Sequence, residues 1–245
     1  MSVQAAQNLS HLPLYLQIKE ALKMDILAGK YAPNERMPSE SSLMSTFEVS
    51  RITVRQALRD LHAEGLIFTA QGKGTFASKP KASQNVQHLQ GFSEAMSQKG
   101  YEVSARLLSI RETSPDKVVR EKLELDGKEP VVEVVRVRYL NRSPVSVDTS
   151  FFPESIGRHL FSKDLGDDIF PILENQLGIQ LGRADICLEA RAADHSNARH
   201  LKTEIGTPIM WVERLTHDVN DKPIDYEYLA FLGDAYKYNF KIFRN

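Results

Sequence analysis

Residues 50–65, SRITVRQALRDLHAEG, decide the fold of the N-terminal part of the chain. Apolar side chains recur there at the spacing of one helix face: Val54, Ala57, Leu58 and Leu61. Ser50 is a typical helix N-cap, and Gly65 is typical of the residue that follows a helix. The stretch therefore predicts a helix with one buried face.

The other face of this predicted helix is basic, because it carries Arg51, Thr53, Arg55 and Arg59. Arg51 and Arg55 lie one turn apart near its start, where a recognition helix presents side chains to the bases of DNA. An arginine can donate two hydrogen bonds to one guanine. A solvated basic face on an ordinary surface helix fits the same residues, so the arginines alone leave both interpretations open.

Two further helices are predicted upstream. Apolar residues recur every four positions from Leu14 to Ile26, and Gly29 ends the pattern. Ser39 is the predicted N-cap of a short second helix, and a tight turn at residues 48–49 separates that helix from the third. Three helices in this order predict a helix-turn-helix.

A β-hairpin is predicted after the third helix. Residues 66–70 and 75–77 have the composition of strands, and Gly72, Lys73 and Gly74 form the turn between them. The glycines let the backbone approach a phosphate or a minor groove closely, and Lys73 supplies a cation. The hairpin is therefore predicted to be a DNA-binding wing, whereas a dinucleotide loop would need a third glycine and a following helix.

These segments contain several motifs in a fixed order: Pro13-Leu14-Tyr15, Met37-Pro38-Ser39-Glu40, Val49-Ser50-Arg51-x-Thr53-Val54-Arg55, Glu64-Gly65-Leu66-Ile67 and Gly72-Lys73-Gly74-Thr75-Phe76. Their order and spacing resemble the GntR superfamily of regulators, in its HutC-like branch. The resemblance implies that residues 1–77 are a winged helix-turn-helix that binds double-stranded operator DNA. The implied DNA contacts are Ser39, Ser50, Arg51, Thr53, Arg55, Gly72, Lys73 and Gly74.

Composition sets broad limits on the rest of the chain. Its 245 residues are 42% hydrophobic and carry a net charge of -1, which favours two domains and does not itself indicate a nucleic-acid partner. The single cysteine, Cys187, is expected to be a buried, inert thiol. Residues 1–11 lack the pattern of a signal peptide, and no apolar run is long enough to span a membrane. We therefore expect a cytoplasmic protein without membrane contact.

The polar residues 78–88 are predicted to be a linker, and residues 89–245 a second domain. Predicted strands at 103–112, 131–140, 145–152, 184–192, 209–219 and 224–232 include hairpin-joined pairs, and helices are predicted at 89–99, 115–123, 167–177 and 194–201. This arrangement predicts an α+β domain with an antiparallel sheet flanked by helices.

Several short motifs lie along this second domain, among them Gly91-Phe92-Ser93, Val135-Arg136-Val137-Arg138, Ser143-Pro144-Val145, Arg214-x-Thr216 and Pro223-Ile224-Asp225-Tyr226. They resemble the UTRA effector domain, which shares its fold with chorismate lyase. The resemblance implies a pocket for a small effector.

Arg136 and Arg138 alternate with valines along one face of a predicted strand. Two cations beside apolar residues require a negative partner. Acids such as Glu213 or Glu227 could supply it inside the protein, or the arginines could bind the carboxylate or phosphate of an effector. The resemblance supports an effector site, because relatives that bind phosphorylated sugars use an Arg-x-Arg here together with residues that match Ser93 and Asp225.

The chain departs from those relatives at four positions. It has Asp168 and Phe170 where they tend to have a Ser-x-Tyr that holds the phosphate, and Phe231-Leu232 where they have Tyr-Arg. An acid and two side chains without hydroxyl groups suit a dianionic phosphate poorly. We therefore expect a smaller acidic metabolite, although Asp168 could equally cap the helix that is predicted to begin beside it.

The combined expectation is a homodimeric repressor that releases its operator when a small acidic metabolite binds, which could be a carboxylate, a phosphonate or a phosphate. A chorismate-lyase-like enzyme and an effector-independent DNA-binding protein are the alternatives. No catalytic elbow, metal-ligand spacing or phosphate-binding loop is present in the sequence, so neither an enzymatic activity nor a cofactor or metal is expected.

Overall fold

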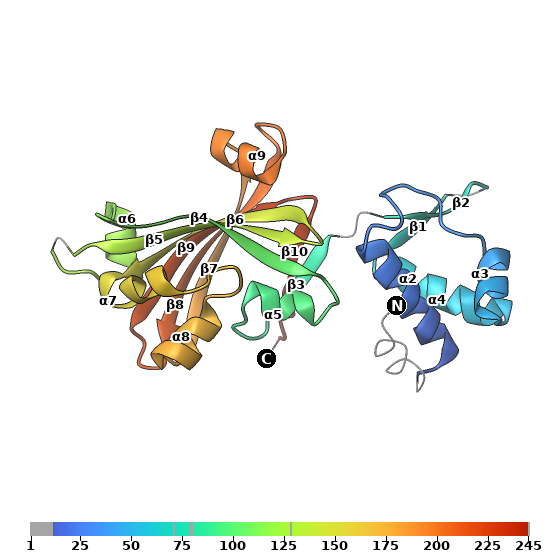
Figure 1. Cartoon of the computed structure of the whole chain (residues 1–245), viewed down its shortest axis with the longest axis horizontal. Helices are drawn as coiled ribbons and strands as arrows, with labels where there is room; N and C mark the ends of the chain where they lie inside the picture. Colours follow the sequence, from blue (N-terminus) through green and yellow to red (C-terminus); the bar gives the residue numbers. More distant parts are fainter. Residues whose placement is uncertain (1–11, 71, 79–80, 128, 245) are drawn as a thin grey trace. The chain divides into compact units, whose positions relative to one another are not determined.

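The computed structural model describes residues 12–70, 72–78, 81–127 and 129–244. The chain divides into two compact units, residues 1–81 and 82–245. Figure 1 traces both units. Within the described residues, no helix is long and apolar enough to cross a membrane.

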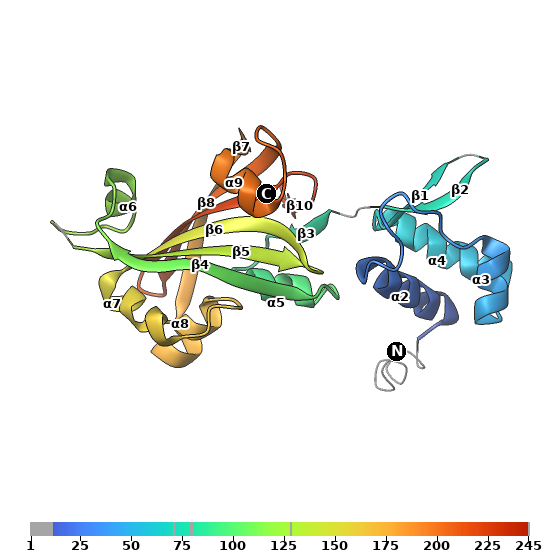
Figure 2. The same ribbon diagram turned by 45° about the horizontal axis from the view of Figure 1, so that its top comes forward.

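Three helices form the body of the first unit (Figure 2): α2 (Leu14–Leu27), α3 (Glu40–Phe47) and α4 (Arg51–Ala63). The predicted caps are confirmed, because the side chains of Ser39 and Ser50 accept hydrogen bonds from the backbone N–H groups of Ser42 and Thr53. α4 buries Val54, Ala57 and Leu61 and packs against α2. The turn from α3 to α4 passes through Glu48 in the left-handed conformation, with φ 53°. The predicted helix-turn-helix is thus present.

The hairpin follows α4 as predicted. β1 (Ile67–Ala70) pairs antiparallel with β2 (Gly74–Ala77), and Phe68 stacks on Phe76 at 5.5 Å between ring centroids. A bridge between Arg36 and Phe76 adds a third segment beside the hairpin. Gly72 and Gly74 both have positive φ, which explains why glycine suits the turn.

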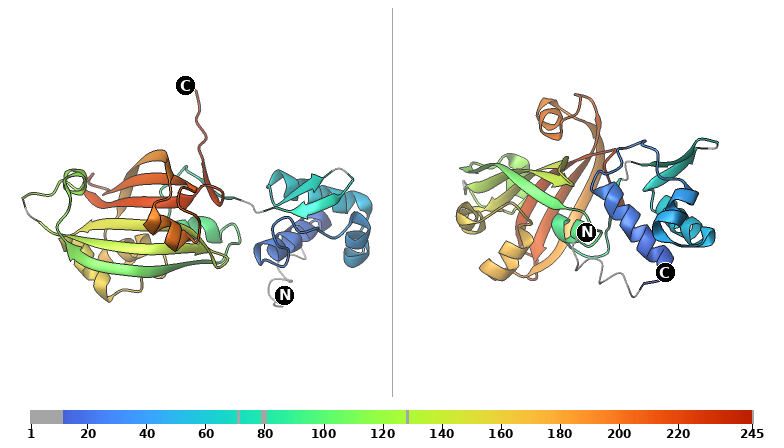
Figure 3. Two further views of the ribbon diagram at one scale, coloured as in Figure 1. Left: turned by 90° about the horizontal axis from the view of Figure 1, so that it is seen from above. Right: turned by 45° about the vertical axis from the view of Figure 1, so that its right-hand side comes forward.

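The second unit is built on a six-stranded antiparallel sheet in the order β4-β5-β6-β9-β8-β7. Its strands are β4 (Val103–Thr113), β5 (Val131–Leu140), β6 (Ser143–Pro153), β7 (Leu181–Ala192), β8 (Pro208–Asp218) and β9 (Pro223–Leu232). Figure 3 shows β9, in red, beside the yellow β6. The predicted strands are confirmed, with β7 three residues longer at its start.

Helices cover both faces of this sheet. α5 (Phe92–Ser97), α7 (Glu154–Gly157), the 3-10 helix η1 (Arg158–Ser162) and α8 (Phe170–Leu177) lie on one face, and α6 (Lys117–Lys122) and α9 (His195–Leu201) on the other (Figures 1 and 2). In the first group, α7, η1 and α8 pack on Val132, Val134 and Phe152, whereas α5 packs on Leu140 and Leu229. α9 packs instead on Val137 and Val147. The sheet therefore has two separate apolar layers.

The linker prediction is wrong for part of residues 78–88. Residues Ala82–Asn85 form a strand, β3, which pairs in parallel with β10 (Tyr236–Asn239) and belongs to the second unit. The strand was not predicted because its sequence is polar: its two buried residues, Ala82 and Gln84, do not form the apolar alternation that is typical of a strand. The buried Gln84 accepts a 2.5 Å hydrogen bond from the hydroxyl group of Tyr236.

Cys187 is exposed, so the expectation of a buried thiol is wrong. It lies on β7, which is the last strand at one edge of the sheet. Many residues of β7 are exposed, because an edge strand has a neighbour on one side only.

Candidate functional site

Charged side chains are buried in the second unit, on the face of the sheet that carries α5 and α8: Arg136, Arg138, Asp148, Asp168, Arg214, Asp225 and Glu227. The strand register places them together. Arg136 on β5 is opposite Asp148 on β6, and Glu227 on β9 is opposite both Ser150 on β6 and Arg214 on β8. Opposite residues of neighbouring strands point to the same face. We call these side chains the buried charge cluster.

Arg138 is neutralised inside the protein. Its guanidinium pairs with Asp148 and, at 2.6 Å, with Asp168, and it lies 5.1 Å from the ring centroid of Phe92. Burial alone would lower the pKa of Arg138, but the two carboxylates outweigh burial and raise the pKa above its ordinary value. Arg138 is therefore a cation with two internal anions.

Arg214 is also neutralised. It pairs with Glu227, and its guanidinium lies 4.9 Å from the ring centroid of Phe170. Ser150 donates a further hydrogen bond of 3.2 Å to Glu227. Internal ion pairing, one of the two interpretations of the Arg-x-Arg pair, therefore holds for Arg138, but through Asp148 and Asp168. Of the acids named as examples, Glu227 pairs with Arg214 and Glu213 accepts a hydrogen bond from Tyr226.

Arg136 differs from both other arginines. Its Nη1 donates to the backbone carbonyls of Asp167 at 2.6 Å and Leu165 at 3.4 Å. Among the residues that the structure describes, Arg136 pairs with no carboxylate, and its Nε has no hydrogen-bond partner. Burial, together with the charge of Arg138, lowers the pKa of Arg136 to about 10. Its charge is therefore only partly compensated.

Asp225 is the acidic counterpart of Arg136. It is 2% exposed, and its Oδ1 has no hydrogen-bond partner in the described part of the chain. Burial raises its pKa well above the ordinary value, and the nearby charge of Glu227 raises it further. A buried carboxylate without a full set of partners is costly, which makes Asp225 a candidate for ligand contact.

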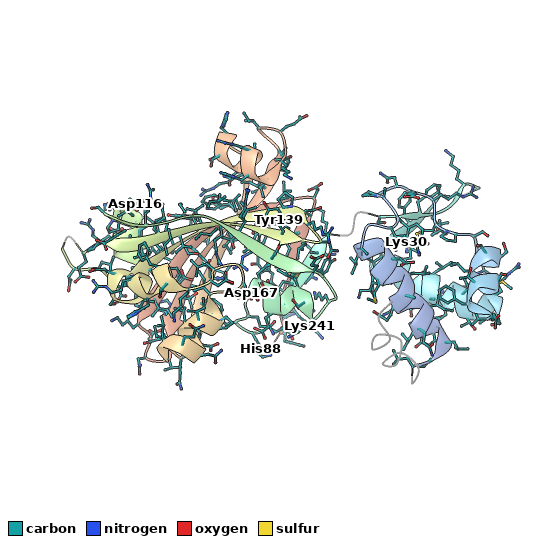
Figure 4. All side chains as sticks on the ribbon, in the orientation of Figure 1. Lys30, His88, Asp116, Tyr139, Asp167 and Lys241 are labelled. Atoms are coloured by element: carbon teal, nitrogen blue, oxygen red, sulfur yellow. The ribbon has the colours of Figure 1, made fainter. Side chains whose placement is uncertain are left out.

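A small cavity opens between these groups, lined by Gly91, Arg136, Arg138, Ser150, Asp168, Ile169, Phe170, Arg214, Asp225 and Glu227. The volume open to the centre of a water molecule is about 10 Å³, roughly what a single water needs. Asp167, labelled in Figure 4, marks the loop that holds Arg136 from the helix side. A ligand larger than a water molecule would therefore fit here only if this loop or α8 moved outward.

Asp168 does not cap α8. Residue Ile169 precedes that helix, and no side chain caps it. Instead the carboxylate of Asp168 accepts a 3.1 Å hydrogen bond from the backbone N–H of Glu94 in α5. Burial opposes ionisation of Asp168, but Arg138 and the N–H groups of Ser93 and Glu94 outweigh it and hold the pKa of Asp168 below its ordinary value.

The other predicted effector residues lie close by. Phe170 lines the cavity, whereas Phe231 lines a second small cavity that shares Arg138 and Arg214 with the first. Ser93 is buried, and its backbone N–H points to Asp168. The structure thus brings Arg136, Arg138, Asp168, Phe170 and Asp225 together, with Ser93 and Phe231 at the border.

Sequence analysis missed Asp148, Ser150 and Arg214 as site residues. Their signal was polar residues two positions apart, as at Ser146, Asp148 and Ser150 of β6 and at Arg214 and Thr216 of β8. Gln84 and Tyr238, which line the second cavity, could not be found this way because β3 and β10 are each only four residues long and β3 has a polar sequence.

The first unit exposes a basic surface on α4. The side chains of Arg51 and Arg55 are 65% and 63% exposed, and Glu40 lies 3.9 Å and 3.3 Å from their Nε atoms. An exposed pair of this kind holds side chains weakly, so both arginines can turn toward a ligand.

The hairpin extends this surface. A groove between α4 and the hairpin is lined by Arg55, Arg59, His62, Thr69 and Thr75, among others. Lys73 is exposed at the turn, and the side chain of Arg36 lies next to Gly74. Arg36 is a cation that sequence analysis did not single out.

Comparison with known proteins assigns both units. Residues 14–77 match the model of the bacterial regulatory proteins of the gntR family, and residues 98–237 match the UTRA domain. The chain belongs to the GntR family. Its UTRA domain places this GntR regulator in the HutC-like branch, as the sequence motifs indicated.

Several relatives of this GntR regulator are curated. It is 31% identical to the HTH-type transcriptional repressor NagR of Bacillus subtilis, over 94% of each chain. It is 26% identical to the histidine utilization repressor of Pseudomonas putida, over 83% of this chain and 82% of the relative. The crystal structure of PhnF from Mycobacterium smegmatis matches its fold with a TM-score of 0.77 at 23% identity, covering 93% of this chain and all of that one (100%).

The GntR regulator is therefore a transcriptional repressor of the GntR/HutC type, and GntR-family regulators bind operator DNA. Curated relatives are repressors, which supports a regulator and not the alternative of a lyase.

Proposed function

We propose that the protein represses transcription as a homodimer and releases its operator when a small acidic metabolite binds to the buried charge cluster. The DNA contacts are the cap residues of α3 and α4, the exposed face of α4 and the hairpin turn: Ser39, Ser50, Arg51, Thr53, Arg55, Gly72, Lys73 and Gly74. Two copies would place two α4 helices on half-sites about 10–10.5 bp apart.

The observation that carries the ligand proposal is the incomplete pairing of Arg136 and Asp225. Arg138 and Arg214 already have carboxylate partners, whereas the hydrogen bonds of Arg136 within the described residues go to carbonyls. An anionic group of the ligand would neutralise the charge of Arg136 and accept its remaining hydrogen bonds, since charge-assisted hydrogen bonds are strong in a buried site. A cationic or hydrogen-bond-donating group of the same ligand would supply the hydrogen bond that Oδ1 of Asp225 lacks.

This pair of requirements favours a small metabolite with a carboxylate and a donor, such as an amino acid or a close derivative. Two relatives are named for the use of amino acids or their derivatives: a histidine utilization repressor and a probable fructoselysine utilization operon transcriptional repressor. The aromatic ring of Phe170 would face an apolar or cationic portion of the ligand.

The mechanism requires a ligand that binds two states of the protein unequally. Entry of a metabolite into so small a cavity would displace the loop at residues 165–169 or α8, and the displacement is the structural change that DNA binding would sense. β3 is a candidate for transmission, because it begins the second unit and contributes Gln84 to the cavity beside Arg138.

The test is a thermal-shift screen of carboxylate metabolites, followed by operator retardation with each compound that stabilises the protein. We expect at least one zwitterionic or carboxylate compound to stabilise the wild type and to release the operator. The Arg136→Met variant should still bind the operator but should no longer respond. Light scattering should show a dimer at micromolar concentration, and a monomer with and without DNA would refute the dimer.

A further inference from the structure

Building on the proposed ligand site, we propose that Asp168 is an internal anion that excludes phosphoryl groups from Arg138. The carboxylate occupies the hydrogen-bond donors that an oxyanion would need. Asp168 would then be a specificity-determining residue that limits the site to ligands without a phosphate at this position.

The donors converge on one carboxylate. Arg138 donates its Nη1 to Oδ1 of Asp168 at 2.6 Å, and the backbone N–H of Glu94 donates to Oδ2 at 3.1 Å. The backbone N–H of Ser93 adds to this set and helps to hold the pKa of Asp168 below its ordinary value. A guanidinium and two successive amides are donors suited to a tetrahedral oxyanion, but here they are already in use.

The space around the carboxylate is also closed. A Cβ atom built on Gly91 would lie 2.1 Å from Oδ2 of Asp168, so the backbone at Gly91 approaches the carboxylate directly. Asp168 itself is 6% exposed. A phosphoryl group in the cavity that Asp168 lines could therefore reach Arg138 only if Asp168 left its position.

The negative charges around Arg138 also disfavour a phosphoryl group. Arg138 already pairs with Asp148 and Asp168, and Glu227 lies in the same cluster. A dianion would bring further negative charge against these buried carboxylates, where like charges repel strongly. Removal of Asp168 would relieve that repulsion and leave Arg138 with Asp148 as its single partner.

Inorganic phosphate is the direct probe, because it needs no knowledge of the natural ligand. Binding to the full-length protein would be measured by titration calorimetry and by thermal shift, against potassium chloride at matched ionic strength. We expect the wild type to show no stabilisation specific to phosphate. Asp168→Ser should bind phosphate at least about tenfold more tightly, because the shorter side chain frees both the donors and the space.

Two variants control for loss of charge. Asp168→Asn removes the charge but keeps the volume, so it should bind phosphate less tightly than Asp168→Ser. Glu174→Gln removes one charge from an exposed position of α8, and its phosphate binding should equal that of the wild type. If Asp168→Ser is too unstable to titrate, Asp168→Asn and Asp168→Gly replace it, and the glycine variant should show the larger gain.

Equal phosphate affinity in the wild type and Asp168→Ser would overturn the inference, whether both bind or neither does. Such a result would leave the proposed metabolite site intact, because that site rests on Arg136 and Asp225. Conversely, a gain of phosphate binding in Asp168→Ser together with a failed metabolite screen would support this inference and count against the proposed function.

Discussion

Replacing Arg138 by methionine should lower the thermal stability of the second unit far more than the same replacement of Arg136. Both side chains are buried and two residues apart on β5. Methionine keeps much of the side-chain volume, so the comparison isolates the charge. The two arginines differ in their partners, because Arg138 neutralises two carboxylates and Arg136 neutralises none.

The magnitudes follow from these contacts. Without Arg138, Asp148 and Asp168 would be buried without their cation, and breaking a buried pair costs about 3–5 kcal/mol. For Arg136, the difference between a pKa of 12.5 and about 10 corresponds to about 3 kcal/mol that disfavours its charge, at about 1.4 kcal/mol per pKa unit. Arg136→Met removes this unfavourable buried charge and also the two hydrogen bonds to carbonyls. The two effects oppose each other, so the variant should change the free energy of unfolding by no more than about 1–2 kcal/mol.

Scanning calorimetry of the full-length variants would measure the difference. A domain of the size of residues 82–245 loses about 2–4 °C of Tm per kcal/mol, so we expect a fall of about 6–20 °C for Arg138→Met and of at most about 8 °C for Arg136→Met. Asp168→Asn in the Arg138→Met background should restore part of the loss. Equal losses in the two single variants would refute the assignment of partners, as would an Arg138→Met protein within about 2 °C of the wild type.

Three further predictions concern other parts of the molecule. Arg51→Ala should weaken specific operator binding by about 1–3 kcal/mol, measured by fluorescence anisotropy. Lys73→Ala should instead weaken binding to all DNA sequences and reduce the salt dependence of binding by about one ion. If both variants bind DNA as the wild type does, the assignment of the DNA-binding surface is wrong. Asp225→Asn should raise Tm, and the gain over the wild type should grow as the pH rises above about 4. The pKa of Asp225 is raised in the folded state, so the stability of the wild type falls above that pH by up to about 1.4 kcal/mol per pH unit. A Tm difference that stays constant from pH 4 to 8 would argue against a raised pKa. Gln84→Leu should leave operator affinity unchanged in retardation assays but weaken metabolite-induced release, because Gln84 lines the cavity beside Arg138; normal release would exclude β3 from transmission.

The sequence was sufficient for the first unit because its signals are local. Helix caps at Ser39 and Ser50 and the apolar stripe of α4 are each set by a few neighbouring residues. The same holds for the long strands of the second unit. β3 was missed because it forms through pairing with β10, about 150 residues later in the chain, and no local pattern reports such a contact.

The site was predicted in outline but not in its pairing. Alternation along β5 placed Arg136 and Arg138 on one face, and the structure agrees. Which acid meets which arginine depends on the order of strands in the sheet, which alternation within one strand cannot give. Asp168 shows the limit most clearly, since its partner N–H groups lie in α5, 74 residues earlier in the sequence than Asp168 itself.

The central claim is that a metabolite bound at Arg136 controls the affinity for DNA. The most direct measurement is operator affinity by fluorescence anisotropy, with and without each metabolite that stabilises the protein, for the wild type and Arg136→Met. We expect the metabolite to weaken operator binding of the wild type by at least about tenfold, and to leave Arg136→Met bound with unchanged affinity. Equal release of both proteins, or stabilising metabolites that leave the operator affinity of the wild type unchanged, would contradict the claim.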